Sequence, residues 1–330
     1  MRFAIVGCGL IGQKRARSLA PKHQLIVAAD VVASRAEALA AVNPGALAVS
    51  DWRAAIDRTD VDAVIVATTN DALAPVTLAA IQFGKHVMVE KPAARTSAEL
   101  EPLIAAAHRH KVCVQTGFNH RYHPAFQKAR ELFEAGALGP LMFIRGRYGH
   151  GGRLGYEKEW RAIPELSGGG ELLDQGVHLI DLAGWFLGPF VHVAGFAHTY
   201  FWDMPVEDNG FLLLRTATDQ VAFLHASCTE WKNLFSFEIY GRDAKLHIEG
   251  LGGSYGVERL SFYRMLPQMG PPETTIWEFP GEDMSWRREL EAFAGFVERG
   301  EIPQPGLAEA TASLQAVEKI YGTLKHDHHA

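Results

Sequence analysis

The chain has few cysteines, no blocks of like charge and no long apolar runs. Its three cysteines, Cys8, Cys113 and Cys228, lie far apart among 330 residues, and no C-x-x-C spacing occurs. A small, odd number of scattered cysteines argues against a disulfide framework, so we expect core thiols in a reducing compartment. No apolar run reaches the roughly 18 residues of a membrane helix, and Met1-Arg2 leads directly into an apolar strand, which leaves no room for a signal peptide. These absences predict a cytoplasmic protein with no membrane partner.

Strong charge is also missing. The formal net charge is −6 and no basic block occurs, which argues against a nucleic-acid partner. With 48% hydrophobic and 21% charged residues, the 330-residue chain has a globular composition and enough length for two domains. The terminal sequence His326-Asp327-His328-His329 clusters imidazoles, but a chain end offers a metal no rigid support. We therefore expect no functional metal.

What the sequence does contain is a glycine motif close to its start. Residues 3–6 form an apolar run, and Gly7-Cys8-Gly9-Leu10-Ile11-Gly12 follows it and opens a stretch typical of a helix. In a strand–turn–helix unit, the first glycine permits a tight turn, the second lets the backbone approach a pyrophosphate, and the third allows close helix packing. The unpaired N–H groups at the helix start then bind the phosphates. The motif predicts a dinucleotide site, and an ordinary strand–helix turn is the alternative.

An acidic residue stands where such a site needs one. The apolar run of residues 25–29 ends in Asp30, about 20 residues past the glycines, where a carboxylate accepts a bond from the ribose hydroxyl. A carboxylate repels a 2′-phosphate, so Asp30 favours NAD as the cofactor. Ser34 and Arg35 follow closely and leave NADP open.

The first 120 residues alternate between strands and helices, which predicts a doubly wound parallel sheet. The expected strands are residues 3–6, 25–29, 47–49, 63–67, 86–89 and 112–115, and the expected helices follow the glycine motif and cover residues 34–42, the stretch after the N-cap Asp51, 72–82 and 97–110.

The alternation of strands and helices changes after Asn119, and we place the domain boundary near residue 120. One helix is expected over residues 124–134 and another over 176–186, and two more over 285–298 and 307–324 close the chain. Between them the expected strands are residues 141–148, 191–198, 210–216, 220–229, 235–240, 245–249, 260–264 and 275–279. This pattern predicts an α+β domain over residues 121–330 with an open, mostly antiparallel sheet, after a Rossmann domain over residues 1–120. The open face of such a sheet is often covered by a second subunit, so we expect a homodimer or homotetramer.

Three segments carry chemistry. The first is Glu90-Lys91-Pro92, at the carboxyl end of an expected parallel strand, where ligands bind in sheets of this kind. Lys91 is expected beside the nicotinamide, with its ammonium donors on a substrate hydroxyl. A solvated lysine at a turn is the alternative.

The second segment pairs a carboxylate with an imidazole. Asp174 and His178 are four residues apart and share one face if the segment is helical. A neighbouring carboxylate fixes the imidazole tautomer and raises its basicity, as a general base requires. Asp181 lies on nearly the same face and is placed to orient the ring from behind. Gly168-Gly169-Gly170 precedes the pair and suggests a backbone that passes close to a ligand. The alternative is a buried core histidine with satisfied hydrogen bonds.

The third segment covers residues 148–161 and has neither a helical nor a strand period. It is rich in glycine, aromatic and charged residues, which is typical of a substrate loop, and a solvated surface loop is the alternative. Its aromatic side chains can stack on a sugar ring, and Arg153 and Arg161 can bind a pyrophosphate. Trp231, just past an expected strand, is placed with it.

Together, the glycine motif, Asn70, Glu90-Lys91-Pro92 and the Asp174–His178 pair resemble the Gfo/Idh/MocA oxidoreductases. This is the group of glucose–fructose oxidoreductase, inositol dehydrogenase and the rhizopine-catabolism proteins. The resemblance covers the whole chain. It departs from the family pattern at Thr69, where a proline is usual, and at Leu73, where a histidine is usual. Both positions concern the packing of the cofactor loop more than the chemistry.

The resemblance implies that Lys91, Asp174 and His178 form the catalytic trio, and that the segment 118–124 lies near cofactor and substrate. The predicted cofactor-binding residues are Gly7, Gly9, Leu10, Ile11, Gly12, Asp30, Arg35, Thr68, Asn70, Glu90, Lys91 and Asn119. The predicted substrate-binding residues are Lys91, Arg121, Tyr148, His150, Arg153, Trp160, Arg161, Asp174, His178 and Trp231.

The function that follows is hydride transfer between a nicotinamide and a ring carbinol of a sugar, nucleotide-sugar or cyclitol. In this hypothesis neutral His178 takes the hydroxyl proton, Asp174 supports the imidazolium or contacts the substrate, and Lys91 holds the reacting oxygen. Two other hypotheses use the same family features. One is a glycosidase that oxidises its substrate transiently, and the other is a regulator that binds NAD and sugar without reaction.

Overall fold

The computed structural model describes residues 1–327, and the terminal histidines 328 and 329 lie outside this range. Two compact units divide the chain. The first contains Met1–Phe118, Glu165–Gly168 and Trp286–Leu314, and the second contains Asn119–Pro164, Gly169–Ser285 and the residues from Gln315 on. The predicted domains, residues 1–120 and 121–330, differ from these units because 165–168 and 286–314 pack with the first.

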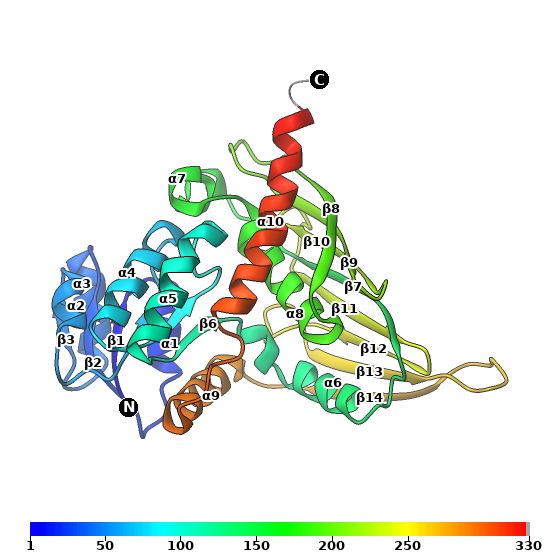
Figure 1. The fold of residues 1–330 in the computed structure, drawn as a ribbon, viewed down its shortest axis with the longest axis horizontal. Helices are drawn as coiled ribbons and strands as arrows, with labels where there is room; N and C mark the ends of the chain where they lie inside the picture. The colour runs from blue at the N-terminus through cyan, green and yellow to red at the C-terminus, as the bar shows by residue number, and fades with distance from the viewer. Residues whose placement is uncertain (328–330) are drawn as a thin grey trace. The chain divides into compact units, whose positions relative to one another are not determined.

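The first unit is built on a parallel sheet of six strands (Figure 1). Its order is β3-β2-β1-β4-β5-β6, and every pair is parallel. The strands are β1 (Arg2–Val6), β2 (Gln24–Ala29), β3 (Leu47–Val49), β4 (Ala63–Val66), β5 (His86–Glu90) and β6 (Val114–Gly117). The chain turns from β1 outward to β2 and later returns to β4 on the other side of β1. The carboxyl ends of β1 and β4 therefore meet at the switch point, where open parallel sheets bind ligands.

Helices connect these strands, and their ends follow from local sequence. Asp51 caps α3, since its carboxylate accepts a bond from the backbone N–H of Arg53, and α4 ends before Gly84, whose φ is +72°. The connecting helices are α1 (Leu10–Arg17), α2 (Ala33–Ala41), α3 (Trp52–Ile56), α4 (Asn70–Gln82), η1 (Ser97–Leu100) and α5 (Glu101–His110). Nearly all of α7 (Pro164–Ser167) and α9 (Ser285–Arg299) and the start of α10 (Leu307–Asp327) also belong to the first unit, whereas α10 from Gln315 on belongs to the second.

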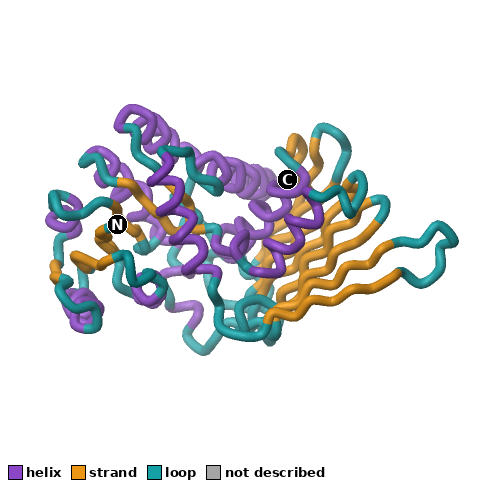
Figure 2. The backbone as a smooth tube through the Cα atoms, turned by 90° about the horizontal axis from the view of Figure 1, so that it is seen from below, coloured by secondary structure: helices purple, strands orange, loops and turns teal. Residues whose placement is uncertain are grey.

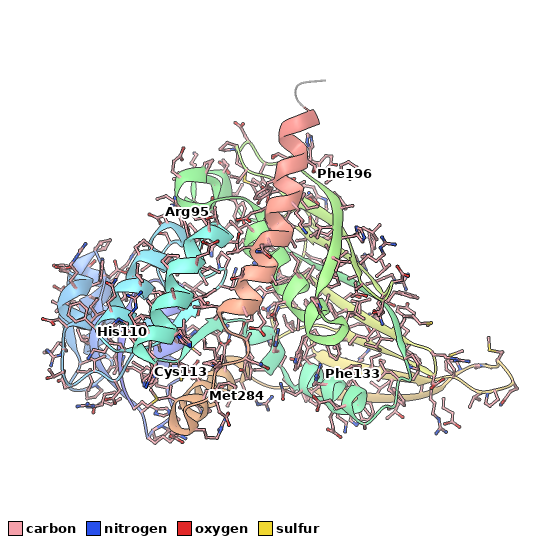
Figure 3. The ribbon with its side chains drawn as sticks, in the orientation of Figure 1. Arg95, His110, Cys113, Phe133, Phe196 and Met284 are labelled. Carbon is pink, nitrogen blue, oxygen red and sulfur yellow. The ribbon has the colours of Figure 1, made fainter. Side chains whose placement is uncertain are left out.

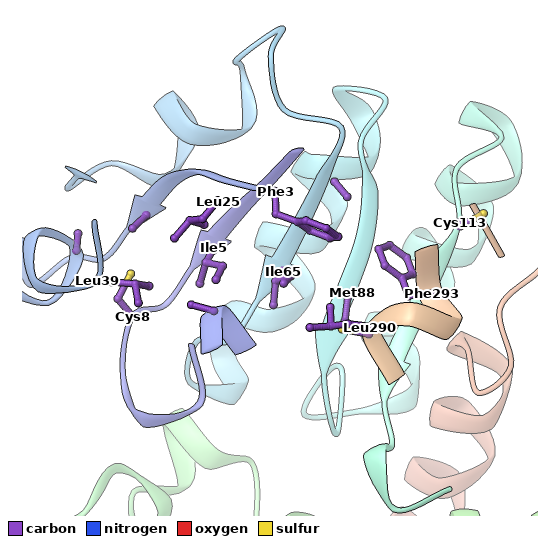
Figure 4. Packing of buried hydrophobic residues seen from close by; sticks show 14 residues of the cluster. Phe3, Ile5, Cys8, Leu25, Leu39, Ile65, Met88, Cys113, Leu290 and Phe293 are labelled. Carbon is purple, nitrogen blue, oxygen red and sulfur yellow. The ribbon is translucent and has the colours of Figure 1, made fainter. Parts of the chain in front are cut away.

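Helix α9 completes the core of the first unit, although it begins 168 residues after the end of β6 in the sequence. Leu290 and Phe293 are fully buried in one cluster with Phe3, Ile5 and Met88 (Figure 4). The Phe293 ring lies 6.4 Å from the Phe3 ring, centroid to centroid. The apolar side chains of α9 are therefore part of the sheet's own core.

The second unit contains a curved sheet of eight strands (Figure 2, orange). Its order is β14-β13-β12-β11-β7-β10-β9-β8, and only the β7–β10 pair is parallel. The strands are β7 (Leu141–Gly149), β8 (Phe190–His198), β9 (Asn209–Thr216), β10 (Val221–Ser227), β11 (Leu234–Gly241), β12 (Ala244–Glu249), β13 (Glu258–Arg264) and β14 (Glu273–Phe279).

Helices cover one face of this sheet. Helix α6 packs on β12, β13 and β14, while η5 and α8 pack on β7 and β10. Alternate residues along the strands are buried under these helices, as period-two patterning requires. The remaining elements of the second unit are η2 (Asn119–Tyr122), α6 (Pro124–Glu134), η3 (Tyr156–Lys158), η4 (Trp160–Ala162), η5 (Leu172–Gly176) and α8 (Val177–Leu187).

The predicted fold class is confirmed: a doubly wound parallel sheet followed by an open, mostly antiparallel one. The three cysteines are free and buried. Among residues 1–327, no helix combines the length and apolarity needed to cross a bilayer. The segment 148–161, expected to be irregular, begins within β7 and contains the short helices η3 and η4.

The packing of α9 generates a stability prediction. Replacing Phe293→Ala removes a fully buried ring and leaves a cavity, so the free energy of unfolding of the first unit should fall by about 3–5 kcal/mol. Urea unfolding measures this. The matched control is Phe83→Ala, whose side chain is half exposed and whose effect should stay below about 0.5 kcal/mol. Equal effects of the two changes would contradict the assignment of α9 to this core.

Candidate active site

The glycine turn after β1 has the geometry of a dinucleotide cradle. Gly7 has a φ of +92°, and a Cβ there would lie 2.4 Å from the carbonyl oxygen of Ala67 at the end of β4. A Cβ on Gly12 would lie 1.9 Å from the carbonyl oxygen of Gly7. By contrast, a Cβ on Gly9 would meet no atom within 4 Å. Packing therefore requires Gly7 and Gly12, whereas Gly9 leaves open space over the start of α1, as a bound pyrophosphate needs.

Asp30 lies directly beside this turn. One carboxylate oxygen accepts a hydrogen bond from the backbone N–H of Cys8 at 2.7 Å, and the other accepts one from Val32 at 2.8 Å. The carboxylate thus fixes the turn and β2 to one another and places a negative charge at the switch point. Arg35 lies nearby on α2 and is exposed. The open space at Gly9 and this acidic acceptor fit a bound dinucleotide.

The end of β4 contributes two further predicted cofactor residues. Asn70 begins α4, is buried, and donates from its side-chain amide to the carbonyl oxygen of Ser167 at 2.8 Å. Thr68 precedes it and is half-buried, with its hydroxyl on the carbonyl oxygen of Thr69. Thr69, the departure from the family pattern, bonds the carboxylate of Asp71 and sits at the N-cap of α4. These contacts shape the loop that borders the switch point.

Glu90, the first residue of Glu90-Lys91-Pro92, takes part in a buried ion triad that sequence reasoning missed. Arg15 of α1 is fully buried and donates to Glu90 at 2.6 Å and to Glu289 of α9 at 2.5 Å. Burial lowers the pKa of Arg15, but the two carboxylates outweigh that effect and raise it overall. A Cβ on Gly117 would collide with the Arg15 guanidinium and the Glu90 carboxylate. The triad therefore fixes the end of β5, and Lys91 follows directly from it.

In the second unit, His178 is buried at the start of α8 and its ring lies within an aromatic cluster. Its closest ring neighbour is His120 of η2, at a centroid distance of 3.8 Å and an interplanar angle of 21°. Tyr148 of β7 meets His178 edge-on at 6.1 Å. Tyr148 is hydrogen-bonded to Tyr255, and burial raises the pKa of Tyr148 well above its usual value and that of Tyr255 to about 12. Both phenols are therefore neutral hydrogen-bonding groups at physiological pH.

Asp174 lies in an element that the sequence did not predict. Residues Leu172–Gly176 form a π-helix, η5, which continues directly into α8. The spacing of Asp174 and His178 is therefore not that of a regular α-helix, and π-turns of this kind are frequent at functional sites. The Asp174 carboxylate accepts a bond from Arg161 at 3.0 Å. This carboxylate is the main cause that raises the pKa of Arg161.

The glycines before this turn have a structural explanation that differs from the expected one. A Cβ on Gly170 would lie 1.9 Å from the backbone oxygen of Glu207, and one on Gly169 would lie 2.2 Å from the Tyr321 hydroxyl. The buried Glu207 carboxylate accepts bonds from Tyr321 at 2.6 Å and from the backbone N–H groups of Gly170 and Leu172. Packing around Glu207 accounts for Gly169 and Gly170, so the idea of a close ligand approach is not needed there. Glu207 and Tyr321 hold the start of η5, and no sequence signal pointed to them.

Ion pairs between its own side chains hold the predicted substrate loop together. Arg153 pairs with Glu159 at 2.7 Å, and Arg161 lies 3.7 Å from the same carboxylate. His150 accepts a bond from the Gly152 N–H and lies 3.5 Å from Glu171, and burial lowers its pKa. Trp160 and Arg161 stack at 4.7 Å. The loop is therefore a braced segment next to η5.

Other predicted residues lie in different surroundings. Arg121 is buried and donates two bonds, at 2.6 and 2.8 Å, to Asp181 of α8. This contact joins Asp181 to Arg121, so the expected role of Asp181 in orienting the His178 ring from behind stays a prediction. Asn119 is buried and donates to the Ser285 hydroxyl at 2.9 Å. Trp231 is mostly exposed, with a left-handed φ of +59°, and its ring meets Phe201 edge-on at 4.8 Å.

Each unit thus carries part of the predicted site. The first unit holds the glycine turn, Asp30, Asn70 and Glu90-Lys91-Pro92. The second unit brings Asp174, His178, Tyr148, His150 and Arg161 into one connected region, joined by the loop and η5. The meeting of Lys91 with the Asp174–His178 pair stays a prediction. Within the described residues, no group of three or more histidine, cysteine or acidic side chains is arranged to hold a metal ion.

Sequence comparisons agree with this architecture. Residues 1–118 match the model of the oxidoreductase family with an NAD-binding Rossmann fold, and residues 126–247 match the Gfo/Idh/MocA C-terminal domain. The first match defines the class: an oxidoreductase-family chain with an NAD-binding Rossmann domain. The two matches together cover well over half of the sequence, and the chain belongs to the Gfo/Idh/MocA family.

Named relatives share parts of the chain. Levoglucosan dehydrogenase of Pseudarthrobacter phenanthrenivorans is 33% identical over 49% of this chain and 42% of its own length. Inositol 2-dehydrogenase 2 of Saccharopolyspora erythraea is 31% identical over 60% of this chain and 57% of its own length. The alignments thus span about half of these relatives. A solved levoglucosan dehydrogenase, in complex with NADH and L-sorbose, has the same fold, with a TM-score of 0.86, 23% identity, and coverage of 98% of this chain and 97% of that one.

The position of Asp30 generates a prediction on cofactor choice. Asp30→Asn removes the negative charge and keeps an oxygen acceptor for the turn, so repulsion of a 2′-phosphate disappears. We expect the ratio of Kd for NADP to Kd for NAD to fall by about tenfold or more, which isothermal titration measures. The control is Asp51→Asn, which changes another carboxylate that accepts a backbone N–H in the same unit. An unchanged ratio in Asp30→Asn would remove Asp30 from the ribose contact.

Proposed function

We propose that this protein is an NAD(P)-dependent dehydrogenase that oxidises a ring carbinol of a sugar or cyclitol. The observation that carries the proposal is the buried His178 ring, held flat against His120 next to the turn that carries Asp174. A fixed, buried imidazole is suited to act as a general base, and we propose that the Asp174 carboxylate supports it. The named relatives, a levoglucosan and an inositol dehydrogenase, support the substrate class.

The cofactor would be held by the first unit. The backbone N–H groups around Gly9, Leu10 and Ile11 would bind the pyrophosphate, and Asp30 would accept a bond from the adenosine ribose. Thr68, Asn70 and Glu90 border the remainder of the predicted site. When bound, the nicotinamide supplies the position that accepts the hydride. NAD is the proposed cofactor because of the charge on Asp30.

Proton transfer falls to the second unit. Neutral His178 would take the proton of the substrate hydroxyl, and the carbon that bears this hydroxyl would give up its hydride to the nicotinamide and become a carbonyl carbon. The Asp174 carboxylate, which is ion-paired with Arg161, would stabilise the imidazolium that forms. Lys91 would donate a hydrogen bond to the reacting oxygen and stabilise its developing negative charge. Tyr148, kept neutral by burial, would offer its hydroxyl to the substrate.

The charge balance of the loop favours an uncharged substrate over a nucleotide-sugar. A pyrophosphate would need Arg153 and Arg161, but both pair with Glu159, and Arg161 also pairs with Asp174. Binding a diphosphate there would require these ion pairs to break. A polyol needs only donors and acceptors, which this braced loop already presents. A free pyranose or cyclitol is therefore the proposed substrate class.

The decisive experiment is a substrate panel followed at the NADH absorbance band. Myo-inositol, levoglucosan, free hexoses, aryl glycosides and a dTDP-sugar are incubated with the protein and NAD or NADP. Net NADH from a polyol or free sugar supports the proposal. Glycoside cleavage without net NADH would instead establish the redox-assisted glycosidase, and sugar binding without either reaction would establish the regulator.

The assignment of the base gives a quantitative prediction. His178→Ala should lower turnover by about 10²–10⁴-fold, because a positioned base contributes that factor, while NAD binding by the first unit survives. The control is His225→Ala, which removes another stacked imidazole of the second unit, 4.3 Å from Phe211. Turnover of His178→Ala within twofold of the wild type would contradict the role of His178.

The open face of the eight-stranded sheet supports a homo-oligomer, which we propose to be a dimer or tetramer. Phe196, Leu213 and Phe223 are each about half exposed or more, on neighbouring strands β8, β9 and β10, and Figure 3 shows Phe196 on β8. Apolar side chains on adjacent strands are typical of a surface that a second copy covers. Light scattering measures the mass: we expect a multiple of 36.3 kDa, and a monomer at micromolar concentration would contradict the proposal.

We also propose that the protein works in the cytoplasm. Its three thiols are free and buried, and burial raises the pKa of Cys8 to about 12 and raises that of Cys113. Unpaired core thiols are typical of proteins that fold in a reducing compartment.

A further inference from the structure

The ring that stacks on His178 belongs to His120, in the segment 118–124 that the family resemblance places near cofactor and substrate without giving His120 a role. His120 lies in the short helix η2, and its ring and that of His178 are both nearly inaccessible to solvent. The two imidazoles lie almost parallel, 3.8 Å apart. This is ring-to-ring contact over a full face, so His178 cannot tilt toward η2 without displacing His120.

His120 is itself held in place by aromatic edges. Tyr148 meets it at 5.0 Å, Phe235 at 5.9 Å and His123 at 5.7 Å between ring centroids, each in an edge-on arrangement. His123 is anchored in turn, because its ring bonds the buried Glu258 carboxylate at 2.9 Å. The stack is therefore braced from the sheet and from η2, and the plane of the His178 ring is set by its surroundings.

The charged and titratable groups around His178 come from four elements packed against α8. η2 contributes His120 and Arg121, and Arg121 is paired with Asp181 of α8. β7 contributes Tyr148, and η5 contributes Asp174, which is paired with Arg161. The titratable residue of β10, His225, stacks on Phe211 of β9. Arg121 and Arg161 are thus each paired with a carboxylate, and the ring that stacks on His178 is the imidazole of His120.

We propose that His120 is a positioning residue. Its neutral ring fixes the plane of the His178 ring and stays stacked on the imidazolium that forms when His178 takes a proton. A cation over a neutral aromatic face is stabilised, whereas two stacked cations repel at this separation. His120 must therefore stay neutral while His178 is charged. The inference rests on the proposed role of His178 as the base and adds the reason for its orientation.

Three substitutions of His120 separate the effects of its flat ring, of its apolar volume and of a positive charge at this position. His120→Phe keeps a flat neutral ring, His120→Leu keeps apolar volume without a ring face, and His120→Arg places a permanent planar cation on His178. The matched control is Phe235→Leu, which removes one ring edge that meets His120 but leaves the face-to-face contact of His120 with His178 in place. Thermal melts and NAD titration establish that each full-length variant is folded.

The main readout is the titration of His178 by NMR on histidine-labelled protein, with the His178 signal assigned from His178→Ala. This measurement needs no substrate. In His120→Arg, the pH at which His178 takes its proton should fall by about one unit or more, since a neighbouring cation disfavours a second positive charge. His120→Phe and Phe235→Leu should leave that pH within a few tenths of a unit. The ring-current shift of His178 should persist in His120→Phe and vanish in His120→Leu.

The kinetic readout uses levoglucosan and NAD. His120→Leu should lose about tenfold or more in kcat with little change in KM for NAD, because the base is displaced while the cofactor unit is unaltered. His120→Phe should recover most of that loss, and Phe235→Leu should stay within about threefold of the wild type.

The inference is overturned if His120→Arg leaves the His178 titration unchanged, or if His120→Leu and Phe235→Leu behave alike in spectra and kinetics. A wild-type His178 that takes no proton between pH 4 and pH 9 would also overturn it. Failure of the proposed function looks different: no NADH forms from any polyol in any variant, while the NMR titrations still show the coupling of the two rings.

Discussion

A guanidinium without access to solvent joins three elements of the first unit that are distant in sequence. Arg15 comes from the helix that follows the glycine turn, Glu90 from the end of β5, and Glu289 from α9. A buried charge is tolerated only with close partners, so each of these elements must be in place for the others to be stable. Trp286 closes the arrangement with its ring 4.4 Å from the Arg15 guanidinium. The glycine turn and Glu90-Lys91-Pro92 therefore have fixed positions before any ligand is present.

In the second unit, hydrogen bonds and aromatic contacts hold the predicted catalytic residues in place. Glu207 accepts backbone and phenol hydrogen bonds at the start of η5, and burial raises its pKa despite those bonds. The turn that carries Asp174 is thus attached to a strand-side loop and to α10, while His178 is held by ring contacts. Hydrogen bonds set the backbone of this region, and aromatic packing sets its key side chain.

Much of the architecture could be predicted from the sequence because it depends on local patterns. Apolar runs of the right length gave the parallel strands, alternation gave the antiparallel ones, and Gly7 and Gly12 proved necessary for packing as expected. The predicted roles of Lys91, Asp174 and His178 stay predictions. What sequence reasoning missed depends on contacts between distant residues: the Arg15 triad, the support of η5 by Glu207 and Tyr321, and the stack of His120 on His178. The π-turn was also missed, since an insertion of this kind has no simple periodic signature.

The membership of α9 in the first unit has a consequence for how the protein is made. Phe3 and Ile5 leave the ribosome first, but Leu290 and Phe293, which cover them, emerge almost last. The nascent six-stranded sheet must therefore persist with part of its apolar surface exposed while residues 119–285, most of the second unit, are synthesised. Long-range contacts of this kind slow the final step of folding and leave an aggregation-prone intermediate. A gene fragment that stops at the apparent domain boundary would encode a Rossmann unit without its last structural layer.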